Sequence, residues 1–117
     1  MRRITVICEE DIQTIINWDV DDPEGVLRFI AERWHWDYLW AEKDGLWVFA
    51  TGGWSGNEEL IEALFKSLLW RVRLSWHTLY LPGGLIIIAA SDEAQRKLEK
   101  LFDYITDWAW GNAGRSD

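Results

Sequence analysis

The amino-acid sequence predicts an α+β fold in which helices pack on a mainly antiparallel sheet. Three observations support this class: an Asp-Gly pair between two apolar runs, apolar residues at helical spacing on both sides of that pair, and a long aliphatic run after a Pro-Gly-Gly turn. The 117 residues suffice for one domain with its own core, so we assign residues 1–110 to a single α+β domain and residues 111–117 to a flexible tail.

The first part of the chain predicts two strands and a helix. Residues 3–8 are rich in β-branched side chains, residues 9–11 predict a turn, and alternating apolar and polar side chains over residues 12–20 predict a second strand. A helix then begins at Pro23, because Asp22 is a good N-cap and proline suits the first helical position. Its apolar stripe contains Val26, Leu27, Ile30 and Trp34.

The middle of the chain predicts a hairpin, a helix and a strand. The dipeptide Asp44-Gly45 lies between the apolar runs 38–41 and 46–51 and is the strongest short-range hairpin signal. Apolar residues at helical spacing predict a helix over residues 60–68. Period-two alternation over residues 70–80 predicts a strand that carries Arg71, Arg73 and His77 on one side.

The last part of the chain predicts a turn, a strand and a helix. The aliphatic run 85–90 follows Pro82-Gly83-Gly84 and predicts a central strand, apolar on both faces. Ser91 then caps a helix with an apolar stripe from Leu98 onward, which Gly111 ends. The order of elements matches a two-layer sandwich with a ferredoxin-like βαββαβ core, an extra N-terminal strand, and a C-terminal hairpin strand plus helix.

One consequence concerns the second face of the sheet. Leu46 and Val48 point to one side of their strand and Trp47 and Phe49 to the other, so both faces are apolar. Either the last helix or another molecule is therefore expected to cover the face that the first two helices leave open.

Composition and charge exclude several classes of function. The net charge of −8 makes the chain a poor partner for nucleic-acid phosphates or an anionic membrane surface. The single cysteine, Cys8, fits a reduced cytoplasmic protein, and neither a signal peptide nor a membrane span is predicted. Because no H-E-x-x-H, C-x-x-C or G-x-S-x-G motif occurs, we predict no catalytic residue, metal ligand or cofactor.

The stretch TGGWSGNEE, residues 51–59, is the leading candidate for a binding loop. Ser55 and Glu58 form a possible capping box, with Asn57 as a competing N-cap. Capping leaves Gly52-Gly53-Trp54 unexplained. A glycine-rich turn before a helix can present backbone N–H groups to an anion, but this loop has acids and no base of its own, so a contact surface centred on the tryptophan is the preferred interpretation.

Further side chains are candidates for the same surface. Trp47 and Trp76 are tryptophans that we expect to neighbour the Trp54 loop. Arg71 and Arg73 are the densest basic feature of an acidic chain. Each of the ten tryptophans would bury roughly 150–250 Å², too much for so small a core to hide completely, so a pocket, a groove or a homodimer contact is expected. The acidic residues between 9 and 24 are either a solvated face or a mimic of nucleic-acid phosphates.

Two resemblances to known families extend these expectations. The segment Phe49 to Glu59, followed by Ile61, Ala63-Leu64, Trp76 and Gly83-Gly84, is similar to a group of small uncharacterised proteins encoded in bacteriophages and prophages. Members often carry Arg-Gly-Gly where this chain has Pro82-Gly83-Gly84. The resemblance implies a phage accessory protein in the cytoplasm of an infected bacterium. The helix start from Asp22 to Leu27 also resembles that of ACT domains, which bind amino acids at dimer interfaces.

The sequence therefore predicts a non-enzymatic protein that acts by binding a host protein, without direct nucleic-acid or membrane contact. Its expected surface is the glycine loop with neighbouring tryptophans, and the resemblance to phage proteins implies interference with a host defence system or host enzyme. Two alternatives stay open: sequestration of a small nucleotide-like signal in an aromatic pocket, and an acidic nucleic-acid mimic.

Overall fold

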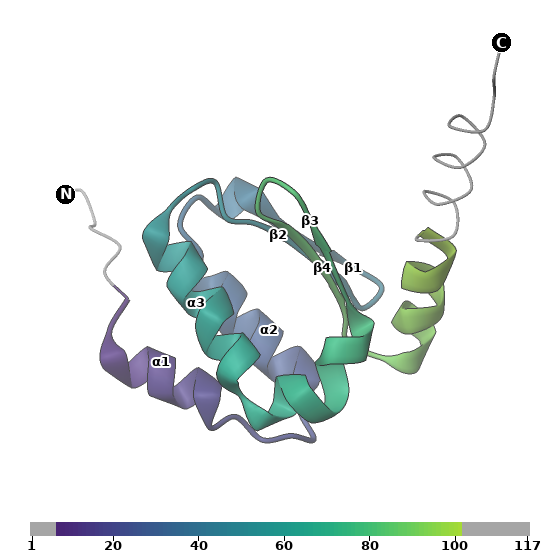
Figure 1. The fold of residues 1–117 in the computed structure, drawn as a ribbon, viewed down its shortest axis with the longest axis horizontal. Helices are drawn as coiled ribbons and strands as arrows, with labels where there is room; N and C mark the ends of the chain where they lie inside the picture. The colour runs from purple at the N-terminus through teal and green to yellow at the C-terminus, as the bar shows by residue number, and fades with distance from the viewer. Residues whose placement is uncertain (1–6, 102–117) are drawn as a thin grey trace, which may run out of the picture.

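The computed structural model describes residues 7–101 as helices on both faces of a four-stranded antiparallel sheet with strand order β1-β2-β4-β3 (Figure 1). Helices α2 and α3 cover one face, and α1 packs alongside α3. A further helix occupies residues 92–101 on the other side of the sheet (Figure 1). The elements are α1 (Glu9–Ile16), α2 (Pro23–Glu32), η1 (Asp37–Leu39), β1 (Trp40–Lys43), β2 (Leu46–Ala50), α3 (Ser55–Lys66), η2 (Trp70–Leu74), η3 (Ser75–His77), β3 (Thr78–Leu81) and β4 (Leu85–Ala89).

The predicted fold class is confirmed. The protein is an α+β sandwich with an antiparallel sheet, broadly consistent with a ferredoxin-like arrangement of layers. Helix α2 begins at Pro23 as predicted, with the Asp22 side chain accepting a hydrogen bond from the N–H of Gly25 (3.0 Å). The turn of the β1–β2 hairpin places Asp44 and Gly45 at positive φ, as a tight hairpin requires.

The strand predicted over residues 12–20 is wrong, and so is the turn at residues 9–11. Both predictions fall largely on α1, whose first turn contains three acidic residues suited to the positive end of a helix. Ile15, which interrupts the period-two alternation, is fully buried, and Ile12 and Ile16 also pack against the core. Spacings of three and four residues bring these isoleucines to one helical face. The extra N-terminal strand falls mostly on residues 1–6, outside the described residues, and Ile7 and Cys8 form no strand.

The strand predicted over residues 70–80 is confined to Thr78–Leu81, and the earlier part of that prediction is wrong. Residues Trp70–Leu74 form a π-helical turn, followed by the 3-10 turn η3. Hydroxyl groups hold these turns: Ser67 Oγ accepts from the N–H of Trp70 (3.0 Å), and Thr78 Oγ1 donates to the carbonyl of Leu74 (2.6 Å). Leu69 and Leu74 are both buried, so tertiary packing and local side-chain hydrogen bonds override the alternation.

The second face of the sheet is covered in part by the helix at residues 92–101. Its Ala94 and Leu98 form a second apolar cluster with Ile87 and Ala89 of β4, as the aliphatic run of an inner strand predicts. Ser91 caps this helix as predicted, its Oγ accepting from the N–H of Ala94 (3.1 Å). The predicted helix end at Gly111 and the tail 111–117 lie outside the described residues.

Candidate functional site

The glycine loop, residues 51–54, joins β2 to α3 through two left-handed glycines. Gly52 has φ 64° and Gly53 has φ 76°, a region that L side chains rarely adopt. The N–H of Thr51 donates to the carbonyl of Gly84 (3.0 Å), and the N–H of Trp54 donates to the carbonyl of Thr51 (3.1 Å). The glycines therefore close a tight turn that presents Trp54 at the start of the helix.

The predicted capping box does not form. The N-cap of α3 is Trp54, no side chain caps the helix, and Ser55 is an exposed residue of the first turn. Asn57 is not the N-cap either. Its side chain is fully buried, and the Oδ1 atom accepts from the N–H of His35 (2.8 Å). The amide nitrogen donates to the carbonyls of His35 (3.2 Å) and Thr51 (3.1 Å). Asn57 thus ties the glycine loop to the segment that follows α2.

This connection creates an aromatic cluster, which we define as His35, Trp36 and Trp54. The His35 and Trp54 rings stack with centroids 4.3 Å apart and planes 19° apart. Trp36 lies 4.2 Å from the His35 ring and meets Trp54 edge-on at 6.0 Å. These offset and edge-on geometries are the favourable arrangements for aromatic pairs, so the cluster is a packed unit and not three independent side chains.

The backbone beneath the aromatic cluster is strained. Trp36 has φ 65°, and left-handed backbone at a non-glycine residue costs about 1–2 kcal/mol. Its carbonyl accepts from the N–H of Leu39 (2.9 Å), which helps to hold the conformation. The Trp36 side chain nevertheless stays 40% exposed, and Tyr38 nearby in the chain is 75% exposed. Strain that holds a large ring at the surface is typical of binding sites.

The ring of Trp54 is also in an unfavourable environment. Its ring nitrogen Nε1 is buried and has no hydrogen-bond partner among residues 7–101. The ring lies against Gly56, where an added Cβ would stand 2.8 Å from Nε1. Gly56 is therefore needed as a surface on which the tryptophan rests. A buried N–H without a partner is unfavourable for stability, and Trp54 shares this feature with Trp47 of the core.

Two exposed glutamates follow Trp54 on α3, and the arginine that precedes the cluster in sequence is engaged elsewhere. Glu58 follows Trp54 by one helical turn, its N–H bonded to the carbonyl of Trp54 (3.1 Å), and both Glu58 and Glu59 are exposed. Arg33 precedes the cluster in sequence, but its guanidinium pairs with Asp11 (3.1 Å) and lies over Phe29 (3.4 Å to the ring centroid). The phosphate-loop interpretation gains no support from these contacts, in which His35 is the one basic residue whose ring stacks on Trp54 among residues 7–101.

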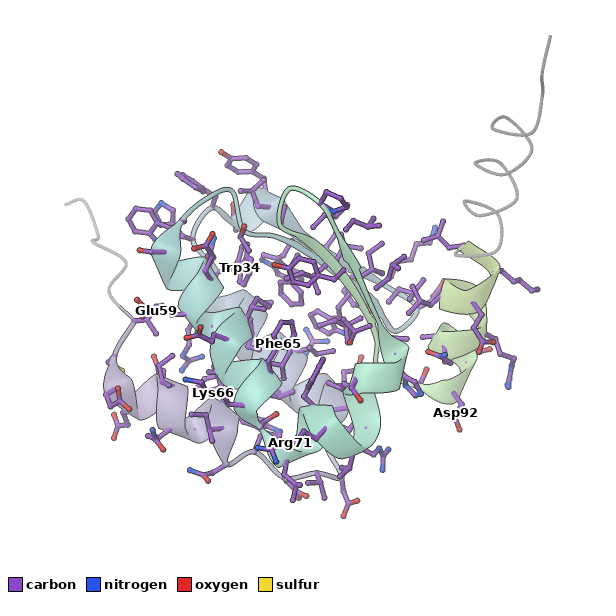
Figure 2. All side chains as sticks on the ribbon, viewed as in Figure 1. Trp34, Glu59, Phe65, Lys66, Arg71 and Asp92 are labelled. Atoms are coloured by element: carbon purple, nitrogen blue, oxygen red, sulfur yellow. The ribbon has the colours of Figure 1, made fainter. Side chains whose placement is uncertain are left out.

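Three of the other predicted site residues, Trp47, Arg71 and Arg73, are not brought to the loop. Trp47 is fully buried in the core, stacked between Trp40 (5.8 Å) and Phe49 (6.2 Å). Arg71 and Arg73 lie in η2, past the opposite end of α3, a helix about 18 Å long. Figure 2 shows Glu59 near the start of α3 and Arg71 beyond its end. Trp76 belongs to η3, and its side chain lies outside what the structure describes.

The sequence prediction missed the contribution of the segment after α2. His35 and Trp36 contact the loop across a sequence gap that no local pattern spans: His35 and Asn57 are 22 residues apart. The one available signal was the Trp34-His35-Trp36 triplet just past a helix end. Trp34 itself is buried, and its Nε1 donates to the carbonyl of Ala50 (3.0 Å), the residue of β2 just before the loop.

The two left-handed glycines allow a matched test of the loop. An added Cβ at Gly52 would lie 3.2 Å from the Trp36 ring and 2.8 Å from Leu39 Cδ1, whereas one at Gly53 would have no atom within 4 Å. We expect Gly52→Ala to lower the free energy of unfolding by about 2 kcal/mol and Gly53→Ala by about 1 kcal/mol. Only Gly52→Ala should change the near-ultraviolet circular dichroism, because only it displaces Trp36. Identical spectra for both variants would contradict the close packing of Trp36 on the loop.

The acidic residues between 9 and 24 and possible metal ligands are weaker candidates for a site than the aromatic cluster. Asp11 pairs with Arg33, Asp19 accepts from the N–H of Asp21 (2.9 Å), and Asp22 caps α2, so three of these acids have local structural roles. Within residues 7–101, no three His, Cys, Asp or Glu side chains are grouped to hold a metal ion. No helix of the same residues is long and apolar enough to cross a membrane.

Comparisons with protein families, curated proteins and solved structures found no match to this chain.

Proposed function

We propose that this chain is a non-enzymatic binding protein whose recognition surface is the aromatic cluster together with the glycine loop. The observation that carries the proposal is Trp36: a large ring held 40% exposed on left-handed backbone, against a stacked His35–Trp54 pair. The position is unfavourable for stability, so contact with another molecule is the better explanation for it.

The partner we propose is a protein. Tryptophan, tyrosine and arginine are the residues most enriched at the energetic centres of protein interfaces, and Trp36, Trp54 and the exposed Tyr38 supply two of these types. Asn57 fixes both halves of the cluster through three hydrogen bonds, so little conformational entropy is lost on binding. An anionic nucleotide is disfavoured, because Glu58 and Glu59 are exposed on the turns of α3 that follow Trp54.

The biological role in this proposal rests on the TGGWSGNE-like block. Similarity to proteins of bacteriophages and prophages supports an accessory protein that acts in an infected bacterial cell, where it interferes with a defence system or another host enzyme. The same block forms the glycine loop and the start of α3, so the segment that carries the resemblance is also the segment that positions Trp54.

Affinity capture from bacterial lysate with paired variants tests the proposal. Trp54→Ala is expected to lose partners that the unmodified protein retains, and Trp36→Ala should lose the same ones. Tyr80→Ala is the matched control, because Tyr80 is 58% exposed on β3 and takes no part in the cluster. Melting temperatures of all variants must stay close to that of the unmodified protein for the comparison to count.

Three results would overturn the proposal. Retention of every partner by Trp54→Ala and Trp36→Ala would remove the aromatic cluster as the recognition surface. Partners lost instead on charge reversal of Asp19 and Asp21 would favour the acidic mimic. A nucleotide found in the unmodified sample and missing from Trp54→Ala would favour the small-ligand alternative.

A further inference from the structure

The charges around the aromatic cluster define the chemistry of a partner side chain. Between residues 34 and 62 the only basic side chains are His35 and Lys43. Lys43 ends β1 beside the hairpin turn, at the opposite end of β2 from the glycine loop. Glu58 and Glu59 are exposed on the first turns of α3, next to Trp54. These two glutamates attract a cation that approaches Trp54 and repel an anion.

The protein already pairs arginine with aromatic rings elsewhere. The Arg28 guanidinium lies over the Trp47 ring (5.2 Å to the centroid), and that of Arg33 lies over Phe29 (3.4 Å). Within the described part of the chain, no arginine or lysine lies over the ring of Trp36 or Trp54. Indoles are the best rings for cation–π contact, and among residues 7–101 neither of these two has an arginine or lysine over it, whereas Glu58 and Glu59 are exposed on the turns of α3 that follow Trp54.

We propose that the aromatic cluster receives an arginine side chain of a partner protein, with the guanidinium against the Trp36–Trp54 rings and Glu58 as its counter-charge. This inference rests on the proposed function and specifies its partner. Arginine fits better than lysine, because its planar guanidinium stacks on an aromatic face and donates two parallel hydrogen bonds to a carboxylate. The net charge of −8 adds long-range attraction for a basic surface around that arginine.

A pair of short peptides tests this inference directly. The probes are acetyl-Gly-Arg-Gly-amide and the same peptide with citrulline, which keeps the shape of arginine but carries no charge. Titration to millimolar concentration is followed by NMR of the tryptophan indole N–H signals. We expect the arginine peptide to shift the Trp36 and Trp54 signals, and the citrulline peptide to bind about two- to fivefold more weakly.

Matched variants identify the counter-charge. Glu58→Gln should weaken arginine-peptide binding by about two- to fivefold, a size typical of an exposed ion pair. Glu62→Gln, one turn further along α3, should leave it unchanged, because Glu62 lies 3.9 Å from Lys66 and farther from the loop. Equal binding of the two peptides, unshifted Trp36 and Trp54 signals, or an unaffected Glu58→Gln variant would each overturn the inference.

The outcomes separate this inference from the proposed function. If Trp54→Ala abolishes partner capture while the two peptides behave alike, the cluster is a recognition surface that does not select arginine. If the peptides differ as expected but capture survives Trp54→Ala and Trp36→Ala, the cluster binds arginine and is not the surface that holds the partner.

Discussion

Replacing Asn57 with alanine is expected to lower the free energy of unfolding by about 3 kcal/mol, a shift of about 10 °C or more in melting temperature. The side chain is fully buried, and its removal strands the N–H and carbonyl of His35 and the carbonyl of Thr51. A buried polar group left without its partner costs about 1–3 kcal/mol, and water can reach half-buried His35 to recover part of that loss.

Urea unfolding followed by tryptophan fluorescence measures this effect, and Ser55→Ala is its control. Ser55 is exposed on the same helical turn and caps nothing, so its loss should change stability by less than about 0.5 kcal/mol. Amide hydrogen exchange adds a local readout, because the His35 N–H should lose protection in Asn57→Ala. Equal stability losses for the two variants would contradict the hydrogen-bonding role given to Asn57.

The successes of the sequence prediction share a local cause. Asp22-Pro23, Asp44-Gly45 and Ser91 act within three or four residues of themselves, through a cap or a turn, and each element begins or turns where they indicate. The aliphatic run 85–90 also needs no distant information, since a strand without polar residues has to lie inside the sheet.

The failures share a different cause. In residues 12–20 and 70–80 the apolar residues satisfy a strand period and a helical spacing at once, and only the partners decide between them. Ile15 reaches the core as part of a helix, and Leu69 and Leu74 do so from successive turns. Neither set of contacts can be read from the alternation itself.

The candidate site divides in the same way. The turn at Gly52-Gly53 was predictable, because a tight turn at a strand end needs positive φ and so favours glycine. The place of Trp54 at the start of α3 follows from its position directly after that turn. The pairing of His35 and Trp36 with that loop depends on Asn57, a buried amide that the capping pattern assigned to a different role. Trp47 was expected at the surface on the strength of its residue type, but pleat alternation places it with Phe49 on the inner face.

Trp47 is a core residue, so its main contribution is to stability. Trp47→Ala is expected to lower the free energy of unfolding by about 4 kcal/mol. The ring is fully buried between Trp40 and Phe49, opposite Ile88 of β4, so its removal leaves a cavity at the centre of the sheet's inner face. Trp36→Ala should cost less than about 1 kcal/mol, because that ring is 40% exposed. Denaturant titration of both variants measures the difference.

Trp47→Phe sharpens the comparison. The Trp47 ring nitrogen is buried without a hydrogen-bond partner among the described residues, so phenylalanine removes an unsatisfied donor together with part of the ring volume. The expected cost is less than about 2 kcal/mol, well below that of alanine. Under conditions in which Trp47→Phe is folded, it should keep full partner capture, whereas Trp36→Ala should be stable and fail to capture. A folded Trp47→Phe that lost its partners would instead place Trp47 within reach of the recognition surface, against its position in the core.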